Sequence, residues 1–141
     1  MLEKTFVIIK PNAVKKHVIG AILKEYEDRG LKIVAMKFQR IQKALAEVFY
    51  EEQSEKPFFQ SLISFITSGP IVVLVLEGVN AVLKNREIIG PTNPEQAPSD
   101  SLRALFGDSV EANALHGSDS VESALREIHL FFKDEAIFSW N

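Results

Sequence analysis

The chain has 141 residues, of which 46% are hydrophobic and 25% charged, and we expect a single compact domain over residues 1–141. It contains no cysteine, which excludes disulfides and thiolate metal sites, and its net charge of −3 provides no general attraction for nucleic acid. No apolar run reaches the roughly 18–20 residues of a membrane span, and the strand-like start does not fit a signal peptide. We therefore expect a cytoplasmic protein with no membrane partner.

The first third of the chain predicts a strand, a helix and a second strand. Residues 5–10 form a short apolar run that ends at Pro11. Apolar side chains recur at helical spacing over 18–30, where the final glycine is a typical helix stop. Residues 31–40 alternate well enough between apolar and polar side chains to form a half-buried strand.

The middle of the chain predicts two helices, the most distinct strand and a further helix. The two helical pieces cover 43–53 and 57–68. Residues 71–76 are apolar without interruption and lie between glycines, which is typical of a buried strand. A helix over 79–90 follows that strand.

The last third predicts a long loop, a short strand and a final helix. The loop covers about 90–111, is rich in proline, and is long enough to be functional. Residues 113–117 form the short strand, and 120–132 form the helix. With the extra helices set aside, the order of elements indicates an α+β fold. This is the ferredoxin-like βαββαβ sandwich, in which helices cover an antiparallel four-stranded sheet.

The final helix begins in a cluster of small polar residues. Its start is expected at Asp119 or Ser120, and Asp119 with Glu122 fits a capping box. The residues with the spacing of its buried face are Val121, Ala124, Leu125 and Ile128.

His116 lies at the end of the predicted short strand, a few residues before that helix. The positive end of a helix attracts an anion such as phosphate, and it favours a neutral, nucleophilic imidazole. Gly117 allows a tight backbone turn beside the ring, and Glu127 can accept a hydrogen bond from one ring nitrogen while the other attacks. A lone histidine at such a junction is more often structural, and we assign that role to His17 and His129.

The segment NALHGSDSVESALREI, residues 113–128, resembles the signature of the nucleoside diphosphate kinase family. The resemblance continues through TFVIIKPNAV, YEEQSEKPFFQSLISFITSGP, VLEGVNAVLKNREIIGPTNP and LFGDSVEANALHGSDSVESA, so it covers nearly the whole chain. It implies that the γ-phosphoryl group of a nucleoside triphosphate, mainly ATP, is transferred to a nucleoside diphosphate. It also implies a ping-pong mechanism with two half-reactions, in which His116 becomes a phosphohistidine.

The resemblance further implies the residues that surround this histidine. The catalytic set that it implies is His116, Glu127, Lys10, Tyr50 and Ser118. The nucleotide-binding set that it implies is Lys10, Phe58, Arg86, Thr92, Arg103 and Asn113.

Each of these residue types suits its implied role. The planar fork of an arginine binds two phosphate oxygens at once, and stacking on Phe58 tolerates any base. Asn113 is expected to contact the ribose 3′-hydroxyl, and Lys10 and Thr92 to contact phosphate. Mg²⁺ is expected to be carried by the nucleotide phosphates, with Asp119 acting through water and no protein-built metal site.

The chain departs from the family pattern near Arg103, where Asp100 replaces a common glycine and Leu105 replaces a common acidic residue. Family members assemble as homo-oligomers, and the short C-terminal tail favours a tetramer over a hexamer.

Two other functions fit the predicted fold. A non-catalytic ferredoxin-like nucleotide-binding module would keep Phe58 but need no histidine. A nucleic-acid-binding protein would need a basic face, for which residues 37–43 are a modest candidate. The sequence lacks G-x-x-x-x-G-K-[ST], which excludes a P-loop kinase of the usual form.

Overall fold

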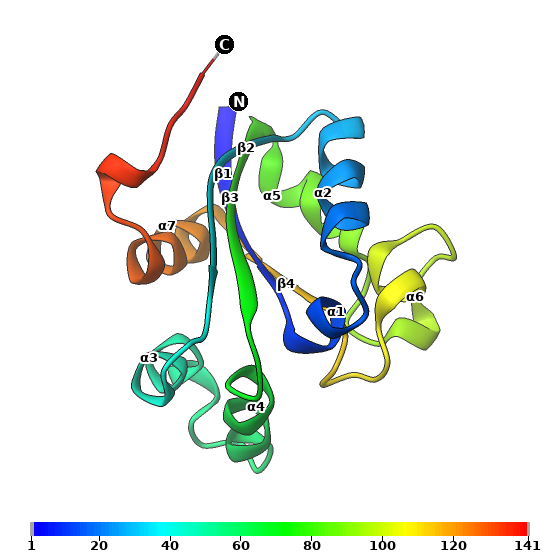
Figure 1. Cartoon of the computed structure of the whole chain (residues 1–141), viewed down its shortest axis with the longest axis vertical. Coiled ribbons are helices and arrows are strands. Elements are labelled where there is room, and N and C mark those ends of the chain that lie inside the picture. The colour runs from blue at the N-terminus through cyan, green and yellow to red at the C-terminus, as the bar shows by residue number, and fades with distance from the viewer. Residues whose placement is uncertain (1, 141) are drawn as a thin grey trace.

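A computed structural model describes residues 2–140 and places them in an α+β fold around one antiparallel sheet (Figure 1). The strands are β1 (Leu2–Ile9), β2 (Lys32–Gln39), β3 (Ile71–Val79) and β4 (Leu115–Gly117). Their order in the sheet is β2-β3-β1-β4, and each neighbouring pair is antiparallel. This is the topology of the ferredoxin-like βαββαβ sandwich, so the predicted fold class is confirmed.

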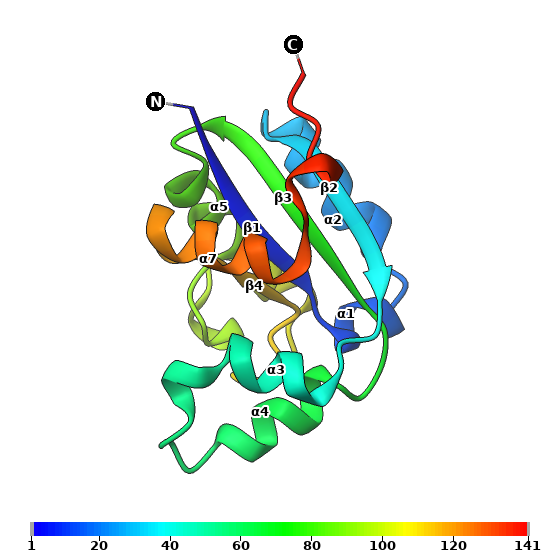
Figure 2. The same ribbon diagram turned by 90° about the vertical axis from the view of Figure 1, so that its left-hand side faces the viewer.

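Helices cover both faces of this sheet (Figures 1 and 2). Helix α7 (Val121–Phe131) packs on one face, while α2 (Ile19–Asp28) and α5 (Ala81–Ile89) pack on the other. The central strands β1 and β3 are therefore buried on both sides, which explains their uninterrupted apolar sequences. Within the described residues, no helix is long and apolar enough to cross a membrane.

Helices α3 (Lys43–Phe49) and α4 (Phe59–Ile66) lie beyond the end of the sheet where β2 ends and β3 begins (Figure 2). The 3-10 turn η1 (Glu51–Gln53) connects them. Because β1 is antiparallel to β3, the last residue of β1 lies at this same end. Lys10 and the start of β4 are consequently placed there as well.

The expected loop over 90–111 is not a bare loop. It contains a 3-10 turn, η2 (Pro94–Gln96), and a short helix, α6 (Leu102–Phe106). Ser101 caps α6, because its side chain accepts a hydrogen bond from the backbone N–H of Ala104. Both departures from the family pattern, Asp100 and Leu105, are exposed, so neither disturbs the buried side of this helix.

Short helices explain the differences between the predicted and observed elements. Helix α6 and helix α1 (Pro11–Lys15), which the sequence also did not predict, have five residues each. Such a segment is too short for apolar residues to repeat at helical spacing. The short helices must therefore be found from the residues at their starts, which are Pro11 at the first helical position of α1 and Ser101 at the N-cap of α6.

Helix α7 begins at one of its two expected starts but differs from its prediction in the capping box and the buried face. Ser120 is the N-cap, since its side chain accepts a hydrogen bond of 3.0 Å from the N–H of Ser123, so Asp119 is not the cap of a capping box. The predicted core residues Val121 and Leu125 are exposed. The buried residues of α7 are Ala124, Glu127, Ile128 and Phe131. The buried face was predicted from apolar residues alone. Because the observed face includes Glu127, the prediction was displaced from it.

Candidate active site

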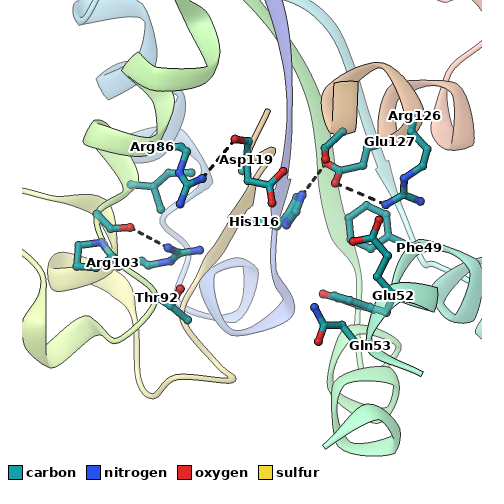
Figure 3. Close-up of a pocket in the computed structure, with 16 residues that line it drawn as sticks. Phe49, Glu52, Gln53, Arg86, Thr92, Arg103, His116, Asp119, Arg126 and Glu127 are labelled. Carbon is teal, nitrogen blue, oxygen red and sulfur yellow. Dashed lines mark hydrogen bonds and ion pairs between the residues drawn. The ribbon is translucent and has the colours of Figure 1, made fainter. Parts of the chain in front are cut away.

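A cavity of about 480 Å³ opens beside β4, between α5, α7 and the end of α3 (Figure 3). It collects side chains from segments that lie far apart in the sequence. The residues expected from the sequence that line it are Tyr50, Arg86, Thr92, Arg103, His116, Asp119 and Glu127.

A tight turn leads into β4 and sets the position of His116. The N–H of Leu115 donates to the carbonyl oxygen of Asn113 at 3.0 Å, and Ala114 between them has a φ of 77°. These features define a γ-turn, which is strained for a residue with a side chain. β4 then pairs with β1 so that His116 lies opposite Ile8. The turn thereby fixes the backbone of Asn113 relative to that of His116.

The His116 ring is held in a defined orientation. Its Nε2 lies 2.8 Å from Oε1 of Glu127, and its ring packs edge-on against Phe49 with 4.9 Å between centroids. A carboxylate only accepts hydrogen bonds, so the hydrogen-bond network assigns the proton to Nε2. Nδ1 then carries the lone pair, and the ring borders the cavity.

The Glu127 carboxylate is buried and has three neighbours. Its Oε1 also accepts a hydrogen bond of 2.8 Å from the Ser118 hydroxyl, which in turn accepts one of 3.2 Å from the N–H of Phe6. Its Oε2 lies 4.0 Å from the guanidinium of Arg126. Ser118 is fully buried and does not line the cavity, so it contacts Glu127 from the protein interior.

Lys10 and Asn113 form a chain of contacts behind Thr92. The ammonium of Lys10 donates to Oδ1 of Asn113 at 2.9 Å, and Nδ2 of Asn113 donates to the carbonyl oxygen of Thr92 at 3.0 Å. Both Lys10 and Asn113 are buried and are not among the cavity-lining residues. Burial, and next the charge of Arg103, lowers the pKa of Lys10 to about 7, although Glu111 opposes this shift.

This lowered pKa predicts a pH-dependent stability. From about pH 7 to 10.5, the unfolded chain binds a proton at Lys10 that the folded chain does not, so the free energy of unfolding rises with pH. Relative to a Lys10→Met variant, we expect the wild type to gain up to about 1.4 kcal/mol per pH unit in this window. Urea unfolding of both proteins at several pH values measures the difference. Stability curves that stay parallel across this range would contradict the assignment.

Two arginines provide positive charge on the other wall of the cavity (Figure 3). The guanidinium of Arg103 donates to the carbonyl oxygens of Gly90 and Leu115 at 2.8 and 2.9 Å. That of Arg86 donates to the carbonyl oxygen of Asp119 at 3.4 Å. Burial, assisted by the charge of Arg86 and opposed by Tyr26, lowers the pKa of Arg103 to about 10, so it remains a cation at neutral pH.

Tyr50 and Phe58 occupy different positions relative to the cavity. Tyr50 follows α3, lines the cavity and packs edge-on against Phe49 at 4.9 Å. Burial, together with the charges of Glu127 and Glu111, raises the pKa of Tyr50, so its hydroxyl stays protonated at neutral pH. Phe58 precedes α4, is 46% exposed and is not part of the cavity lining.

Sequence reasoning missed several polar residues of the cavity wall. These are Glu52, Gln53, Ser123 and Arg126. The spacing of Ser123, four residues before Glu127, was a usable signal, because residues four apart share a helix face. Arg126 is adjacent to Glu127, and that spacing gives no such signal. Within residues 2–140, no group of three or more His, Asp or Glu side chains is placed to hold a metal ion.

Comparisons with known proteins agree on one family. The family model described as nucleoside diphosphate kinase matches residues 3–137. The chain is 54% identical to a nucleoside diphosphate kinase of Campylobacter jejuni subsp. doylei, over 97% of this chain and 100% of that one. It is 53% identical to that of Campylobacter curvus, over 93% and 96%.

Solved structures give the same result. The nucleoside diphosphate kinase of Aquifex aeolicus has a TM-score of 0.95 at 44% identity, covering 97% of this chain and 99% of that chain. A halophilic nucleoside diphosphate kinase from Halobacterium salinarum, in complex with CDP, has a TM-score of 0.96 at 40% identity, covering 100% and 94%.

The fold and the comparisons together define a phosphotransferase that acts on nucleotides. The chain belongs to the nucleoside diphosphate kinase family, and it has the activity of that family, the transfer of the γ-phosphoryl group of a nucleoside triphosphate to a nucleoside diphosphate. The predicted resemblance is thereby confirmed, and a non-catalytic or nucleic-acid-binding function is set aside.

Proposed function

We propose that Nδ1 of His116 is the nucleophile of this reaction. In the first half-reaction its lone pair attacks the γ-phosphorus, a P–N bond forms, and the P–O bond to the departing nucleoside diphosphate breaks. In the second half-reaction the terminal oxygen of another nucleoside diphosphate attacks the same phosphorus and releases the ring. The observation that carries this proposal is the 2.8 Å contact between Nε2 of His116 and Glu127, because it leaves the lone pair on Nδ1.

The charged neighbours have complementary roles in this proposal. Glu127 stabilises the positive charge that develops on the ring, and Ser118 orients Glu127. Arg86 and Arg103 neutralise the phosphate oxygens from the opposite wall, assisted by the hydroxyl of Thr92. Transfer of a phosphoryl group needs mainly this positioning and charge neutralisation.

Lys10, Asn113 and Tyr50 complete the proposed site. Lys10 and Asn113 are already hydrogen-bonded to each other, so a nucleotide would meet them as one unit. We assign Lys10 to the phosphates and Asn113 to the ribose 3′-hydroxyl, and the neutral hydroxyl of Tyr50 is a hydrogen-bond donor beside the nucleophile.

Phe58 is proposed as the platform for the base, since its exposed ring offers a face on which any base can stack. The nucleotides that we propose as substrates include both purine and pyrimidine compounds. The Halobacterium salinarum relative was solved with CDP, a pyrimidine nucleotide, which supports this breadth.

Mg²⁺ is the cofactor that we propose for this enzyme. The exposed carboxylate of Asp119 lines the cavity, and it suits contact with a hydrated ion held by the nucleotide phosphates. The bound ion supplies charge neutralisation on the phosphate oxygens. Asp119 would orient one of its water ligands without displacing it.

Steady-state kinetics test the two half-reactions. We expect double-reciprocal plots of rate against ATP, at several fixed concentrations of GDP, to be parallel, as a ping-pong mechanism requires. We also expect exchange of label between ADP and ATP with no acceptor present. Intersecting lines without exchange would show direct transfer between two bound nucleotides and would contradict the proposal.

Replacing Glu127 by glutamine tests its role toward the ring. The amide keeps the shape of the side chain but removes the charge, so phosphorylation of the enzyme should slow by roughly 10–100-fold, less than on loss of His116. Rapid-quench measurement of phosphoenzyme formation gives this rate. A variant as fast as the wild type would remove Glu127 from the mechanism.

We propose that the enzyme works as a homo-oligomer in the cytoplasm, and a tetramer is favoured over a hexamer. Sedimentation equilibrium distinguishes the two assemblies directly. A mass of six chains would overturn the tetramer.

A further inference from the structure

Arg126 lines the cavity but has no part in the mechanism proposed above. It immediately precedes Glu127 on α7, and its guanidinium lies 4.0 Å from Oε2 of that residue. Figure 3 shows the Arg126 side chain extended beside Glu127, with Glu52 below it on the same side of the cavity and Arg86 and Arg103 across from it. The contact therefore involves the one carboxylate that holds the nucleophile.

The two oxygens of Glu127 have different neighbours. Oε1 accepts hydrogen bonds from His116 and Ser118, both at 2.8 Å. Within residues 2–140, Arg126 is the one cationic side chain paired with Oε2. A buried carboxylate that loses a charged partner is costly to keep in place and ionised, so the orientation of Oε1 depends on what holds Oε2.

Charges on the surrounding elements make this pairing important. Apart from Arg126 itself, the titratable and charged groups that line the cavity around Glu127 are Tyr50 after α3, Glu52 in η1, Arg86 in α5, Arg103 in α6, His116 in β4 and Asp119 before α7. Glu52 and Asp119 are acidic and repel a further carboxylate. Arg86 and Arg103 lie on the other wall and face the proposed phosphate position. The positive charge of Arg126, which lies next to Glu127, offsets the negative charge of these acidic groups.

We propose that Arg126 is a positioning residue for phosphoryl transfer, which holds Oε2 of Glu127 so that Oε1 remains directed at Nε2 of His116. This inference rests on the proposed role of His116. When Nδ1 attacks phosphorus, the ring becomes positively charged, and the aligned carboxylate stabilises that charge. Arg126 acts through Glu127 and contacts neither the nucleotide nor the reacting atoms.

The test compares Arg126→Gln with Arg126→Lys, which keeps the positive charge. We expect the rate of phosphoenzyme formation in Arg126→Gln to fall roughly three- to tenfold, with a KM for ATP within about twofold of the wild type. Arg126→Lys should restore most of the rate.

A double-variant cycle shows whether the effect passes through Glu127. In a Glu127→Gln background, the further change Arg126→Gln should have almost no effect on the rate, because the charge on which it acts is gone. Arg29→Gln is the matched control, since Arg29 forms an exposed ion pair with Glu25 on α2 and should leave the rate unchanged.

Three results would overturn the inference: an unchanged rate and KM in Arg126→Gln, a full additional loss in the Glu127→Gln background, or a raised KM with an unchanged rate. The last result would make Arg126 a phosphate ligand. Arg126 is partly exposed, so the variants are expected to fold, and thermal unfolding checks this. If the wild type itself carried no phosphate on His116, the proposed function would fail instead, and the two failures are therefore distinguishable.

Discussion

Replacing His116 by alanine is expected to reduce phosphoryl transfer by at least about 10⁴-fold while leaving the fold intact. No other imidazole lines the cavity, in the part of the chain that the structure describes, so no second nucleophile of this kind can take over. The ring is half-buried at the edge of the sheet, and Ser118 and Arg126 would still neighbour the Glu127 carboxylate. A coupled assay of nucleoside triphosphate formation gives the activity, and circular dichroism gives the fold.

His129→Ala is the matched control for this experiment. His129 lies on the same helix as Glu127, but its side chain is 66% exposed and its nearest charged partner is Asp134. We expect full activity and an unchanged thermal transition. Appreciable turnover by a folded His116→Ala protein would remove this histidine as the nucleophile.

Replacing Arg103 by methionine is expected to damage both stability and activity. The guanidinium joins two carbonyl oxygens, those of Gly90 before the proline-rich segment and of Leu115 beside the proposed nucleophile. Loss of both hydrogen bonds in this partly buried position should cost about 2–4 kcal/mol of unfolding free energy. The same change removes a cation from the proposed phosphate site, so kcat/KM should fall by roughly 100-fold or more.

Lysine cannot replace this arginine, because a single ammonium lacks the fixed fork that reaches both carbonyl groups. Arg103→Lys should therefore recover little of either property. Arg40→Met, at an exposed position after β2, provides the control and should change neither. Urea unfolding and steady-state kinetics measure the two effects, and an Arg103→Met protein with wild-type stability and activity would contradict this account.

The sequence predicts the sheet well because its strands differ sharply from their surroundings. The buried run over Ile71–Leu76 and the short apolar segment before Lys10 belong to the central strands, where burial on both faces requires apolar side chains. β2 forms as an edge strand, but the expected alternation is wrong, because Val34 and Ala35 are both buried while residues 36–38 are exposed. A register irregularity between Ile33 and Ala35 interrupts the pattern.

The errors of the sequence analysis arise where local patterns are short or where a polar residue is buried. Helices α1 and α6 are too short to show a period. The buried face of α7 was misplaced because Glu127 occupies it, and that burial is the feature that orients the His116 ring. A violation of the apolar pattern here marks the proposed site itself.

His116 and Glu127 were also indicated by their positions around the start of the last helix, but the other site residues could be named from the sequence only through the family motifs. Arg86, Thr92 and Arg103 come from α5, the segment after it and α6, and only the fold brings them beside His116. Their residue types alone would equally suit an exposed surface. Arg126 lies within the motif over 113–128, but the resemblance implied no role for it, and its contact with Glu127 became visible only in three dimensions.

The central claim is that a phosphoryl group resides on His116 between the two half-reactions. The most direct test incubates the enzyme with ATP labelled at the γ-phosphate and maps the label by peptide analysis. We expect one label per chain, on the peptide that contains His116, which is stable in base, labile in acid and removed by GDP. A label on a different residue, or no label in an enzyme that turns over, would contradict the account.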